Sequence, residues 1–368
     1  MPENFSTPIN AEDLIKLIRE LAARLAPRRL KIMEVCGTHT VAAQSAGIRS
    51  VLPENVKLIS GPGCPVCVTP AGYIDQAAQL AADRGARVVT YGDMVRVPGI
   101  STTLEEARRR GGDVSVVYSV TEALQMARRE AKRHVVFLGV GFETTAPGTA
   151  FAVKAAHDEG LKNFKVLMAH KRIIPAMDAL LADPNLAIDG FIAPGHVSVI
   201  IGYEAYAPIV SRWGRPCVVT GFTGEQMLLS IVRILTQLVS GHSKVESVYT
   251  SRVLPEGNVK AQRFLDEVFV PGPSNWRGMG NIPESGMDLR EEYADCDAKG
   301  FFKLEEPPDR EPPGCRCADV IRGMLDPPEC PLFGKRCTPM TPVGACMVSR
   351  EGSCSAFYRF RSVEKWSG

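Results

Sequence analysis

The first clear pattern along the chain is an apolar stripe near the N-terminus. Residues 11–26, AEDLIKLIRELAARLA, carry apolar side chains three or four positions apart, as in one face of a helix. The stripe consists of Leu14, Ile18, Leu21 and Leu25. Asn10 is placed to cap the start of this helix and Pro27 to end it. We therefore expect an amphipathic helix with one buried face.

Beyond this helix, short apolar segments alternate with amphipathic ones to about residue 245. The segments that we interpret as strands are LKIMEV, VKLIS, ARVVTYG, DVSVVYS, HVVFLGVG, FKVLMAH, DGFIAPG and PCVVTG. Helix-like stretches such as AGYIDQAAQLAADRG and GEQMLLSIVRILTQLVSG follow them. Apolar strands in repeated β–α alternation indicate parallel sheets covered by helices on both faces. The predicted fold class is therefore α/β, with Rossmann-like parallel-sheet units.

The number of strands is sufficient for two such units and suggests three regions along the chain. We place the boundary between the units near residue 130, in the basic stretch RREAKRH, which gives domains at 1–130 and 131–245. From 246 to 368 the alternation fades and Pro, Gly and Cys increase, as in EEPPDREPPGCRC. Such a stretch cannot build much regular core and is commonly held by a metal or packed on a neighbour.

Composition narrows the class of protein. The 368 residues are 45% hydrophobic and 23% charged, as in a soluble globular protein, and the net charge of +2 gives no reason to expect nucleic acid or a membrane surface as a partner. No apolar run is long enough to span a bilayer, and MPENFSTPIN lacks the features of a signal peptide. We therefore expect a cytoplasmic protein. Its eleven cysteines are then metal ligands or redox groups rather than a disulfide framework.

Several polar clusters follow predicted strands, where ligands bind in open parallel sheets. These clusters are CGTHT (36–40), GPGCPVC (61–67), YGDMVRVPG (91–99), GFETTAPGT (141–149), AHK (169–171) and APGH (193–196). If both sheets point their strand ends at one cleft, the clusters converge there. The glycine-rich GFETTAPGT has neither the Walker A nor the Rossmann spacing. The polar candidates outside the cysteine motifs are Glu143, Thr144, Thr145, His170, Lys171 and His196, for which a helix start or a structural histidine is the alternative.

Two cysteine motifs lie among these clusters. Cys36 and His39 pair a soft thiolate with an imidazole, which suits iron or zinc, and a following helix would lower the thiol pKa. The alternative is a buried Cys with a hydrogen-bonded His. Cys64 and Cys67 lie in a strand-to-helix turn, the position of thioredoxin-like dithiols. Redox or iron chemistry is favoured for this pair, while a Cys3His zinc site with Cys36 and His39, or an inert pair, stays open.

A second group of cysteines lies near the C-terminus. Six of them fall within forty residues, namely Cys315, Cys317, Cys330, Cys337, Cys346 and Cys354. Four thiolates can hold a [4Fe–4S] cluster or a zinc ion. The absence of paired C-x2-C knuckles disfavours a zinc ribbon and favours the cluster, so we predict an irregular, Cys-rich iron–sulfur domain at 246–368.

Taken together, the motifs resemble one family over nearly the whole chain, the hydrogenase maturation factor HypD family. The resemblance rests on MEVCGTHT, GPGCPVCVTP, YGDMVRVPG, GFETTAPGTA, FIAPGHVSVIIG, WRGMGNIPESG and CPLFGKRCTPMTPVGACMVSREGSC. It implies two α/β domains and a cluster-bearing third. One segment departs from the family, which usually has GFEP where this chain has GFTGEQ (221–226). We therefore assign no role to an acid there.

The resemblance also implies a function. HypD-like proteins are scaffolds for the Fe(CN)2CO group of [NiFe] hydrogenases, with a small HypC-like chaperone and a HypE-like cyanide donor. Iron is held transiently by the Cys of CGTHT, here Cys36, with His39 close by. The family spacing Cys-x14-Cys-x6-Cys-x16-Cys assigns the [4Fe–4S] cluster to four of the cysteines and leaves Cys317 and Cys346 outside. The four are Cys315, Cys330, Cys337 and Cys354.

We accordingly predict a redox-active assembly scaffold rather than a stand-alone enzyme. Cys64 and Cys67 would form a dithiol beside the iron site and exchange with cysteines near the cluster. One alternative is an autonomous iron–sulfur thiol–disulfide oxidoreductase, which would turn over alone. A third class is a zinc-stabilised binding protein without redox activity, with Cys64 and Cys67 as metal ligands.

Overall fold

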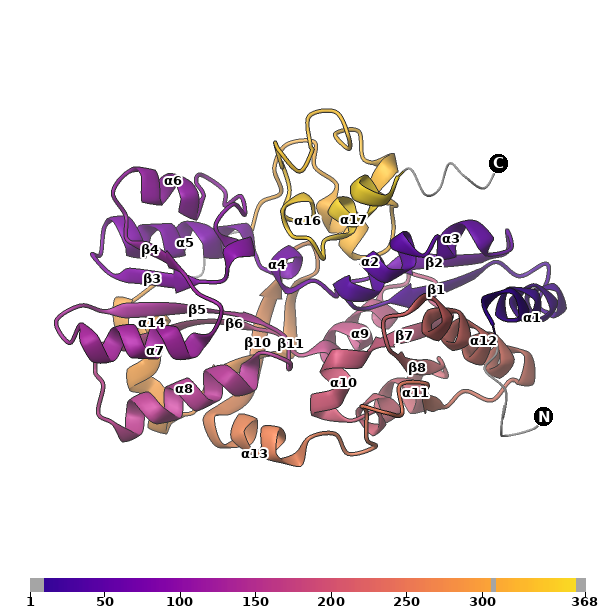
Figure 1. Cartoon of the computed structure of the whole chain (residues 1–368), viewed down its shortest axis with the longest axis horizontal. Helices are drawn as coiled ribbons and strands as arrows, with labels where there is room; N and C mark the ends of the chain where they lie inside the picture. The colour runs from indigo at the N-terminus through magenta and orange to yellow at the C-terminus, as the bar shows by residue number, and fades with distance from the viewer. Residues whose placement is uncertain (1–9, 306–308, 362–368) are drawn as a thin grey trace.

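The computed structural model describes residues 10–305 and 309–361. Figure 1 shows two α/β units side by side, with a mostly irregular C-terminal segment lying over the junction between them. The fold is therefore α/β with two parallel sheets and a cysteine-rich region, as the sequence predicted. No helix in the described part of the chain combines the length and the apolar character needed to cross a membrane.

The larger sheet has five parallel strands in the order β2-β1-β7-β8-β9. Its strands are β1 (Leu30–Glu34), β2 (Val56–Ser60), β7 (Gly190–Pro194), β8 (Cys217–Thr220) and β9 (Val245–Ser247). The helices of this unit are α1 (Ala11–Arg24), α2 (Gly37–Ser45), α3 (Ile48–Val51), α10 (Gly195–Ile201), α11 (Ala207–Trp213) and α12 (Gly224–Ser240), with the short 3-10 helix η2 (Glu204–Tyr206). In Figure 1, α1 and α12 lie next to each other at the outer end of this unit, and their apolar faces share one core.

The predicted N-terminal helix is confirmed as α1. The Asn10 side chain accepts a hydrogen bond from the Asp13 backbone N–H at 2.9 Å, which satisfies one of the free donors at the helix start. Leu14, Ile18 and Leu21 of the apolar stripe are buried. Leu25, the C-cap residue, is half-buried, because the helix ends there.

The second sheet has four parallel strands in the order β4-β3-β5-β6. Its strands are β3 (Arg87–Thr90), β4 (Val114–Val116), β5 (Val135–Gly141) and β6 (Phe164–His170). The helices of this unit are α4 (Pro65–Val68), α5 (Ala71–Ala82), α6 (Leu104–Arg109), α7 (Val120–Arg129) and α8 (Ala146–Asp158), with η1 (Gly92–Met94). The next helix, α9 (Ile173–Ala182), packs against α11 of the five-stranded unit and against β11 (Gly280–Leu289). Figure 1 shows α5 and α6 on one face and α7 and α8 on the other. All residues of β5 are buried, as expected for a central parallel strand.

The two sheets are not consecutive stretches of chain. β1 and β2 belong to the five-stranded sheet, the next four strands build the other sheet, and the chain then returns with β7. A division at residue 130 would separate β4 from β5, although β3 pairs with both of them. The boundary between 1–130 and 131–245 therefore does not separate the sheets. The β–α alternation is the same in both units, so local pattern could not reveal where the chain crosses.

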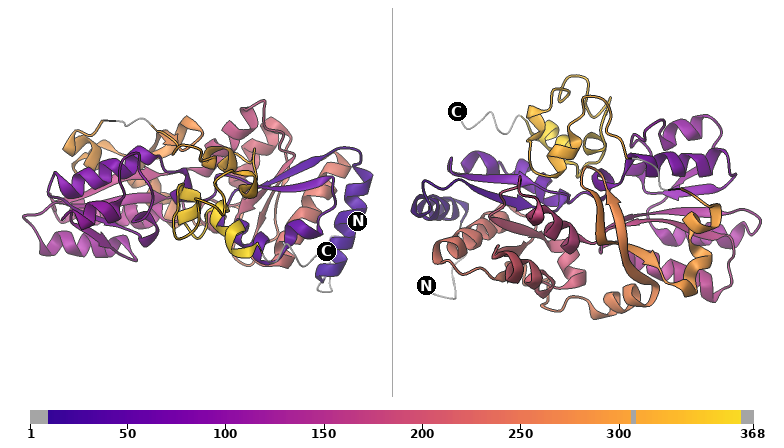
Figure 2. Two further views of the ribbon diagram at one scale, coloured as in Figure 1. Left: turned by 90° about the horizontal axis from the view of Figure 1, so that it is seen from above. Right: turned by 180° about the vertical axis from the view of Figure 1, so that it is seen from behind.

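The region after residue 246 contains more regular structure than we expected. Its elements are α13 (Val259–Val268), β10 (Phe269–Trp276), β11 (Gly280–Leu289), η3 (Glu291–Cys296), α14 (Ala298–Phe302), α15 (Cys317–Ile321), η4 (Pro327–Glu329), α16 (Ala345–Val348) and α17 (Ser353–Phe360). β10 and β11 form an antiparallel hairpin that runs between the two α/β units in the view from behind in Figure 2. The cysteine-rich part, from α15 to α17, is largely irregular.

Candidate functional site

A cleft lies between the two units, at the carboxyl ends of strands from both sheets. Its cavity has a volume of about 300 Å³. Its lining residues include Cys36, Thr38, Gly63, Pro65, Tyr91, Asp93, Thr144, Thr145, Pro194, His196 and Glu351. Five of the six strand-end clusters therefore meet at one site, as the position of ligands in open parallel sheets predicts. The sixth cluster, AHK, lies elsewhere.

Cys36 occupies the N-cap position of α2 with an extended backbone, and it lines the cleft. Two glycines allow the surrounding loops to approach it. A Cβ on Gly63 would lie 2.1 Å from the Cys36 backbone nitrogen, and one on Gly37 would lie 2.5 Å from the Glu351 carbonyl oxygen. The glycines of the motifs CGTHT and GPGC are therefore required for close packing at this thiol.

The thiol of Cys36 is harder to ionise than its position suggested. Burial raises its pKa to about 12, and the carboxylates of Glu351 and Glu34 add to this effect. The backbone N–H groups at the start of α2 lower it by a smaller amount. The expectation that the helix would leave a low thiol pKa was wrong, because loss of solvation outweighs the helix terminus.

His39 lies behind the cleft rather than in it. Its ring is fully buried, and Nε2 is 3.0 Å from the Gly221 carbonyl oxygen and 3.3 Å from that of Thr220. Burial lowers the pKa of His39 to about 4, so the ring is neutral and donates from Nε2. Its Nδ1 has no hydrogen-bond partner among the described residues. His39 therefore ties α2 to the end of β8, which matches the structural alternative for this residue.

An aromatic stack connects His39 to the cleft. The Phe222 ring lies 4.9 Å from the ring of His39 and 4.1 Å from that of His196, which lines the cleft. Phe222 belongs to GFTGEQ, the segment that departs from the family pattern. In the same segment, Thr223 and Gln226 form a capping box that begins α12, so these polar residues have a structural role.

The residues of GFETT line two different cavities. Thr144 and Thr145 line the cleft, whereas Glu143 lines a separate cavity of about 420 Å³ together with Arg172. One Glu143 oxygen accepts a hydrogen bond from the Ile173 backbone N–H at 2.9 Å, and burial raises the pKa of this carboxyl to about 7. Glu143 thus anchors the start of α9 and does not face Cys36 directly.

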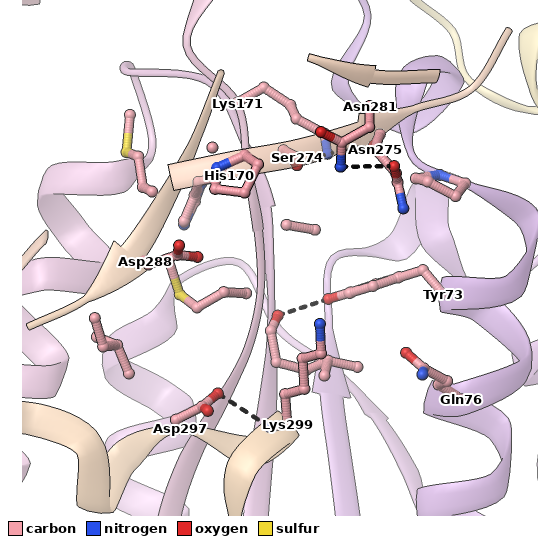
Figure 3. A pocket seen from close by; sticks show the side chains of 18 of the residues that line it. Tyr73, Gln76, His170, Lys171, Ser274, Asn275, Asn281, Asp288, Asp297 and Lys299 are labelled. Atoms are coloured by element: carbon pink, nitrogen blue, oxygen red, sulfur yellow. Dashed lines mark hydrogen bonds between the residues drawn. The ribbon is translucent and has the colours of Figure 1, made fainter. Parts of the chain in front are cut away.

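His170 and Lys171 do not reach the cleft either. His170 is the last residue of β6, the edge strand of its sheet, and Lys171 follows it. Both line another cavity of about 420 Å³ against the hairpin (Figure 3). The Lys171 Nζ donates to the Asn275 carbonyl oxygen at 2.7 Å, and the His170 Nε2 lies 2.9 Å from the Thr149 hydroxyl. Their predicted place in the cleft was wrong, because β6 lies at the edge of its sheet and Lys171 pairs there with Gly286 of the hairpin.

Cys64 and Cys67 flank the cleft wall but point away from the open space. Cys64 caps α4, and its sulfur accepts the Cys67 backbone N–H at 3.3 Å. Both thiols are buried, whereas Pro65 and Val66 between them line the cleft. The Cys67 thiol is in hydrogen-bonding contact with Cys346 of α16, and burial raises its pKa well above the usual value. The pair therefore faces the cysteine-rich region.

The six C-terminal cysteines converge on one small cavity, together with Leu332, Phe333, Gly344 and Met347. The Cys317 and Cys346 sulfurs are 2.9 Å apart, and Cys346 also contacts Cys354. Since Cys346 touches Cys67 as well, a continuous series of thiols joins this cavity to the CPVC motif. The two cysteines outside the family spacing, Cys317 and Cys346, are the ones that complete this series.

The thiol cavity fits an iron–sulfur cluster in the chemistry of its donors. All polar side chains that line it are cysteines, the ligands that such clusters take. The Val343 backbone N–H lies 3.3 Å from the Cys337 sulfur, and a Cβ on Gly344 would lie 2.7 Å from the Cys315 sulfur. Within residues 10–305 and 309–361, no three His, Cys, Asp or Glu side chains are already spaced to hold one metal ion. The assignment of four ligands therefore stays a prediction.

Sequence reasoning missed the loop at 349–352, which bridges the cleft. The Thr38 hydroxyl donates to a Glu351 oxygen at 2.7 Å, and the Ser349 hydroxyl donates to an Asp93 oxygen at 3.0 Å. Thr38 belongs to the five-stranded unit and Asp93 to the four-stranded unit. The sequence feature that could have indicated this loop is Glu351 in MVSREGSC, an acidic residue between the clustered cysteines Cys346 and Cys354.

Known proteins resemble this chain over nearly its full length. A family model named HypD, described as "Hydrogenase formation hypA family", matches residues 10–361. The hydrogenase maturation factor HypD of Escherichia coli (strain K12) is 44% identical over 367 residues, with 98% of each chain covered. A putative hydrogenase expression/formation protein of Methanocaldococcus jannaschii is 43% identical, covering 96% of this chain and 99% of the relative. The hydrogenase maturation factor HypD of Cupriavidus necator is 40% identical, covering 94% and 96%. These similarities include both sheets, the cleft and the cysteine-rich region.

Proposed function

The chain belongs to the HypD family of hydrogenase maturation factors, and from this premise we propose that it is the scaffold and redox partner on which the Fe(CN)2CO group of [NiFe] hydrogenases is assembled. A HypC-like chaperone and a HypE-like cyanide donor would be its partners. The protein would act as an assembly scaffold in the cytoplasm and not as a stand-alone enzyme.

One observation carries this proposal: the Cys36 thiol lies in a cleft from whose wall a series of thiols leads to a cysteine-lined cavity. The cleft, at about 300 Å³, is at the lower end of the size range of small-molecule sites. An anchoring thiolate and a neighbouring source of electrons are the two things that assembly of a low-valent iron group requires.

In this proposal each cleft residue has a defined part. The Cys36 thiolate binds the incoming iron, which is cargo and leaves with the product. His39 acts indirectly, because its hydrogen bonds to the end of β8 fix the first turn of α2 and hence the Cys36 sulfur. His196 faces the same space and is available to donate a hydrogen bond to a ligand of the iron.

The thiol series supports a two-electron exchange. In the oxidised form, a Cys317–Cys346 disulfide would be attacked at Cys346 by the Cys67 thiolate, and Cys64 would then displace Cys346. The products are a Cys64–Cys67 disulfide and two thiols, so two electrons and two protons move without another reagent. The contact of Cys67 with Cys346 supports this order of attack.

The cluster assignment is a separate part of the proposal. Cys315, Cys330, Cys337 and Cys354 would hold the [4Fe–4S] cluster, which supplies single electrons when bound. The convergence of all six thiols on one apolar-walled cavity supports a cluster there, and the choice of these four rests on the family spacing. Anaerobically purified protein should contain about four iron and four sulfide per chain. Cys330→Ala should lose both, while zinc without sulfide would contradict the assignment.

The decisive test of the scaffold function is iron retention in a complex with the HypC-like chaperone. Wild-type protein purified with that partner should carry iron beyond the cluster, with infrared bands of bound cyanide and carbon monoxide. Cys36→Ala should lose this additional iron and the infrared bands and keep its sulfide content. Retention of the bands in Cys36→Ala would exclude Cys36 as the anchor.

The alternative, an autonomous iron–sulfur thiol–disulfide oxidoreductase, predicts the opposite dependence on partners. Such an enzyme would reduce a disulfide substrate at full rate without the chaperone and the cyanide donor. Both CPVC thiols are buried in the structure, which disfavours direct exchange with an external protein disulfide. Multiple turnover by the isolated chain would support the alternative.

A further inference from the structure

The cysteine-rich region carries a group of exposed basic residues that the proposed function does not use. We call this group the basic rim, and it consists of Lys335, Arg336, Arg350, Arg359 and Arg361. Lys335 and Arg336 lie in the loop between Cys330 and Cys337. Arg359 lies on α17, Arg361 is its C-cap, and Arg350 lies in the loop at 349–352 that precedes it. The region appears at the top of Figure 1, above the junction of the two units.

Contacts place the two parts of the basic rim on one continuous surface. The Phe333 ring, in the Cys330–Cys337 loop, packs edge-on against the Tyr358 ring of α17 at 6.1 Å. The Arg361 guanidinium lies 4.4 Å over the same Tyr358 ring. Arg359 donates to the Arg350 carbonyl oxygen, which places the Arg359 side chain against the Arg350 backbone.

The charge of the basic rim is not compensated within the described part of the chain. Other cations of this region have acidic partners: Arg316 pairs with Asp319 and Arg322 with Asp183. Among the described residues, no carboxylate lies within 4.0 Å of a rim cation. Burial, and then repulsion from Arg350, lowers the pKa of Arg359. Five exposed cations that form no ion pair with another described residue create a positive potential that attracts an acidic surface.

The basic rim also lies where the cover over the thiols is thin. Cys330 and Cys337, which bound the Lys335 loop, are 8% and 6% exposed, and Leu332 and Phe333 from the same loop line the thiol cavity. The loop therefore has one side on the thiols and its two cations on the outside. A redox centre just below a basic, partly aromatic surface is suited to docking a protein that delivers electrons.

We propose that the basic rim is the docking site for a small acidic one-electron carrier protein. In the complex, one electron leaves the carrier and reduces the cysteine-rich centre by one, and no bond is made or broken. This inference rests on the proposed function, because it assumes a redox centre in the thiol cavity. The rim supplies electrostatic attraction and orientation, so its effect falls as salt screens the charges.

The experiment uses the full chain, purified anaerobically, with a reduced plant-type [2Fe–2S] ferredoxin as the acidic carrier. The rate of electron transfer is followed by stopped-flow absorbance, and binding is measured separately by calorimetry, at several salt concentrations. We expect the rate of electron transfer and the binding affinity to fall as the salt concentration rises. The double variant Lys335→Glu/Arg336→Glu should lower each of them by about tenfold or more. The matched control is Arg108→Glu/Arg110→Glu, which reverses two exposed cations at the end of α6 and should stay within about twofold of wild type.

Iron and sulfide are measured on the same preparations. A failure of the proposed docking site can therefore be distinguished from a failure of the proposed function. A protein with a full cluster that ferredoxin neither binds nor reduces in a rim-dependent manner overturns the docking site and leaves the scaffold function intact. Salt-dependent, rim-dependent binding to protein without sulfide supports the docking site and removes the cluster from the proposed function. Binding of phosphatidylserine vesicles at the rim, without binding of ferredoxin, would assign it to a lipid surface and overturn the proposal.

Discussion

Burial decides the chemistry of single residues at this site more than position in an element does. Cys36 is the N-cap of a helix, yet its pKa rises to about 12, and the pKa of His39 falls to about 4. Sequence places both residues at a strand end, because motif spacing and the alternation of elements are visible in it. It cannot show how much water remains around each group, since that depends on loops from distant segments such as 349–352.

Glu143 offers a test of burial through the pH dependence of stability. Its pKa is about 7 in the folded protein against 4.5 for the ordinary carboxyl. Between these values the folded state binds more protons than the unfolded state, so stability is lost as pH rises through this range. Glu143→Gln cannot ionise. Its free energy of unfolding should equal that of wild type at about pH 4 and exceed it at about pH 8 by on the order of 1–3 kcal/mol.

Urea unfolding of both proteins across this pH range measures the difference. Glu256→Gln, at an exposed position, is the matched control and should give parallel curves. If the free energies of unfolding of Glu143→Gln and wild type changed with pH in the same way, the Glu143 carboxyl would be solvated in the folded protein.

At the scale of elements, amphipathic helices were predictable and the hairpin was not. α1 follows its apolar stripe and its cap closely, because both signals are local. The hairpin β10–β11 contains Pro271, Pro273 and several glycines, which are unusual within strands and indicated irregular chain. The strands form nevertheless, because β11 packs against β6 and α9, contacts that no local pattern encodes.

The hairpin also holds α4, the element that carries the CPVC dithiol. Arg277 is fully buried in the hairpin turn. Its side-chain Nε donates to the Thr69 carbonyl oxygen at 3.0 Å, and its backbone N–H donates to the Val68 carbonyl oxygen at 2.8 Å. These carbonyls follow or end α4, so the side chain caps this short helix from outside. Arg277→Ala should cost about 2–4 kcal/mol of stability and expose Cys64 and Cys67.

Mass spectrometry after a timed pulse of alkylating reagent would locate the exposed thiols, and calorimetry would give the loss of stability. Arg290→Ala is the control, because Arg290 also donates to a backbone carbonyl, that of Asp266, but is exposed. Unchanged alkylation of the CPVC thiols in Arg277→Ala would show that α4 is held by its own packing.

At the scale of the whole molecule, the interleaved chain determines what can fold alone. A fragment of residues 1–130 would contain β1 and β2 without β7, and β3 and β4 without the fully buried β5. In each incomplete sheet, a strand that is central in the full chain would become an unpaired edge, and an apolar face would be exposed to water. We expect this fragment to show no cooperative urea transition by circular dichroism, in contrast to the full chain. A sharp transition with a native-like spectrum would mean that one unit is independent.

The convergence of distant motifs was the most predictable feature of the site. Five strand-end clusters meet in the cleft because the rule for parallel sheets depends only on strand direction. AHK was misplaced because strand order within a sheet is not visible locally, and β6 turned out to be an edge. Glu351 and the link from Cys67 to Cys346 were not predictable, since both join segments about 300 residues apart.

The path of the chain between the two sheets affects how the two units can move relative to each other. The chain passes from one sheet to the other after β2, back after β6, and across again after β9 toward α13, which packs on α8. A change in the spacing of the two units must bend all three crossover segments at once. It must also strain the loop at 349–352, which is hydrogen-bonded to Thr38 on one side of the cleft and to Asp93 on the other. Cargo entering beside Cys36 therefore meets walls that are connected at several points around the opening.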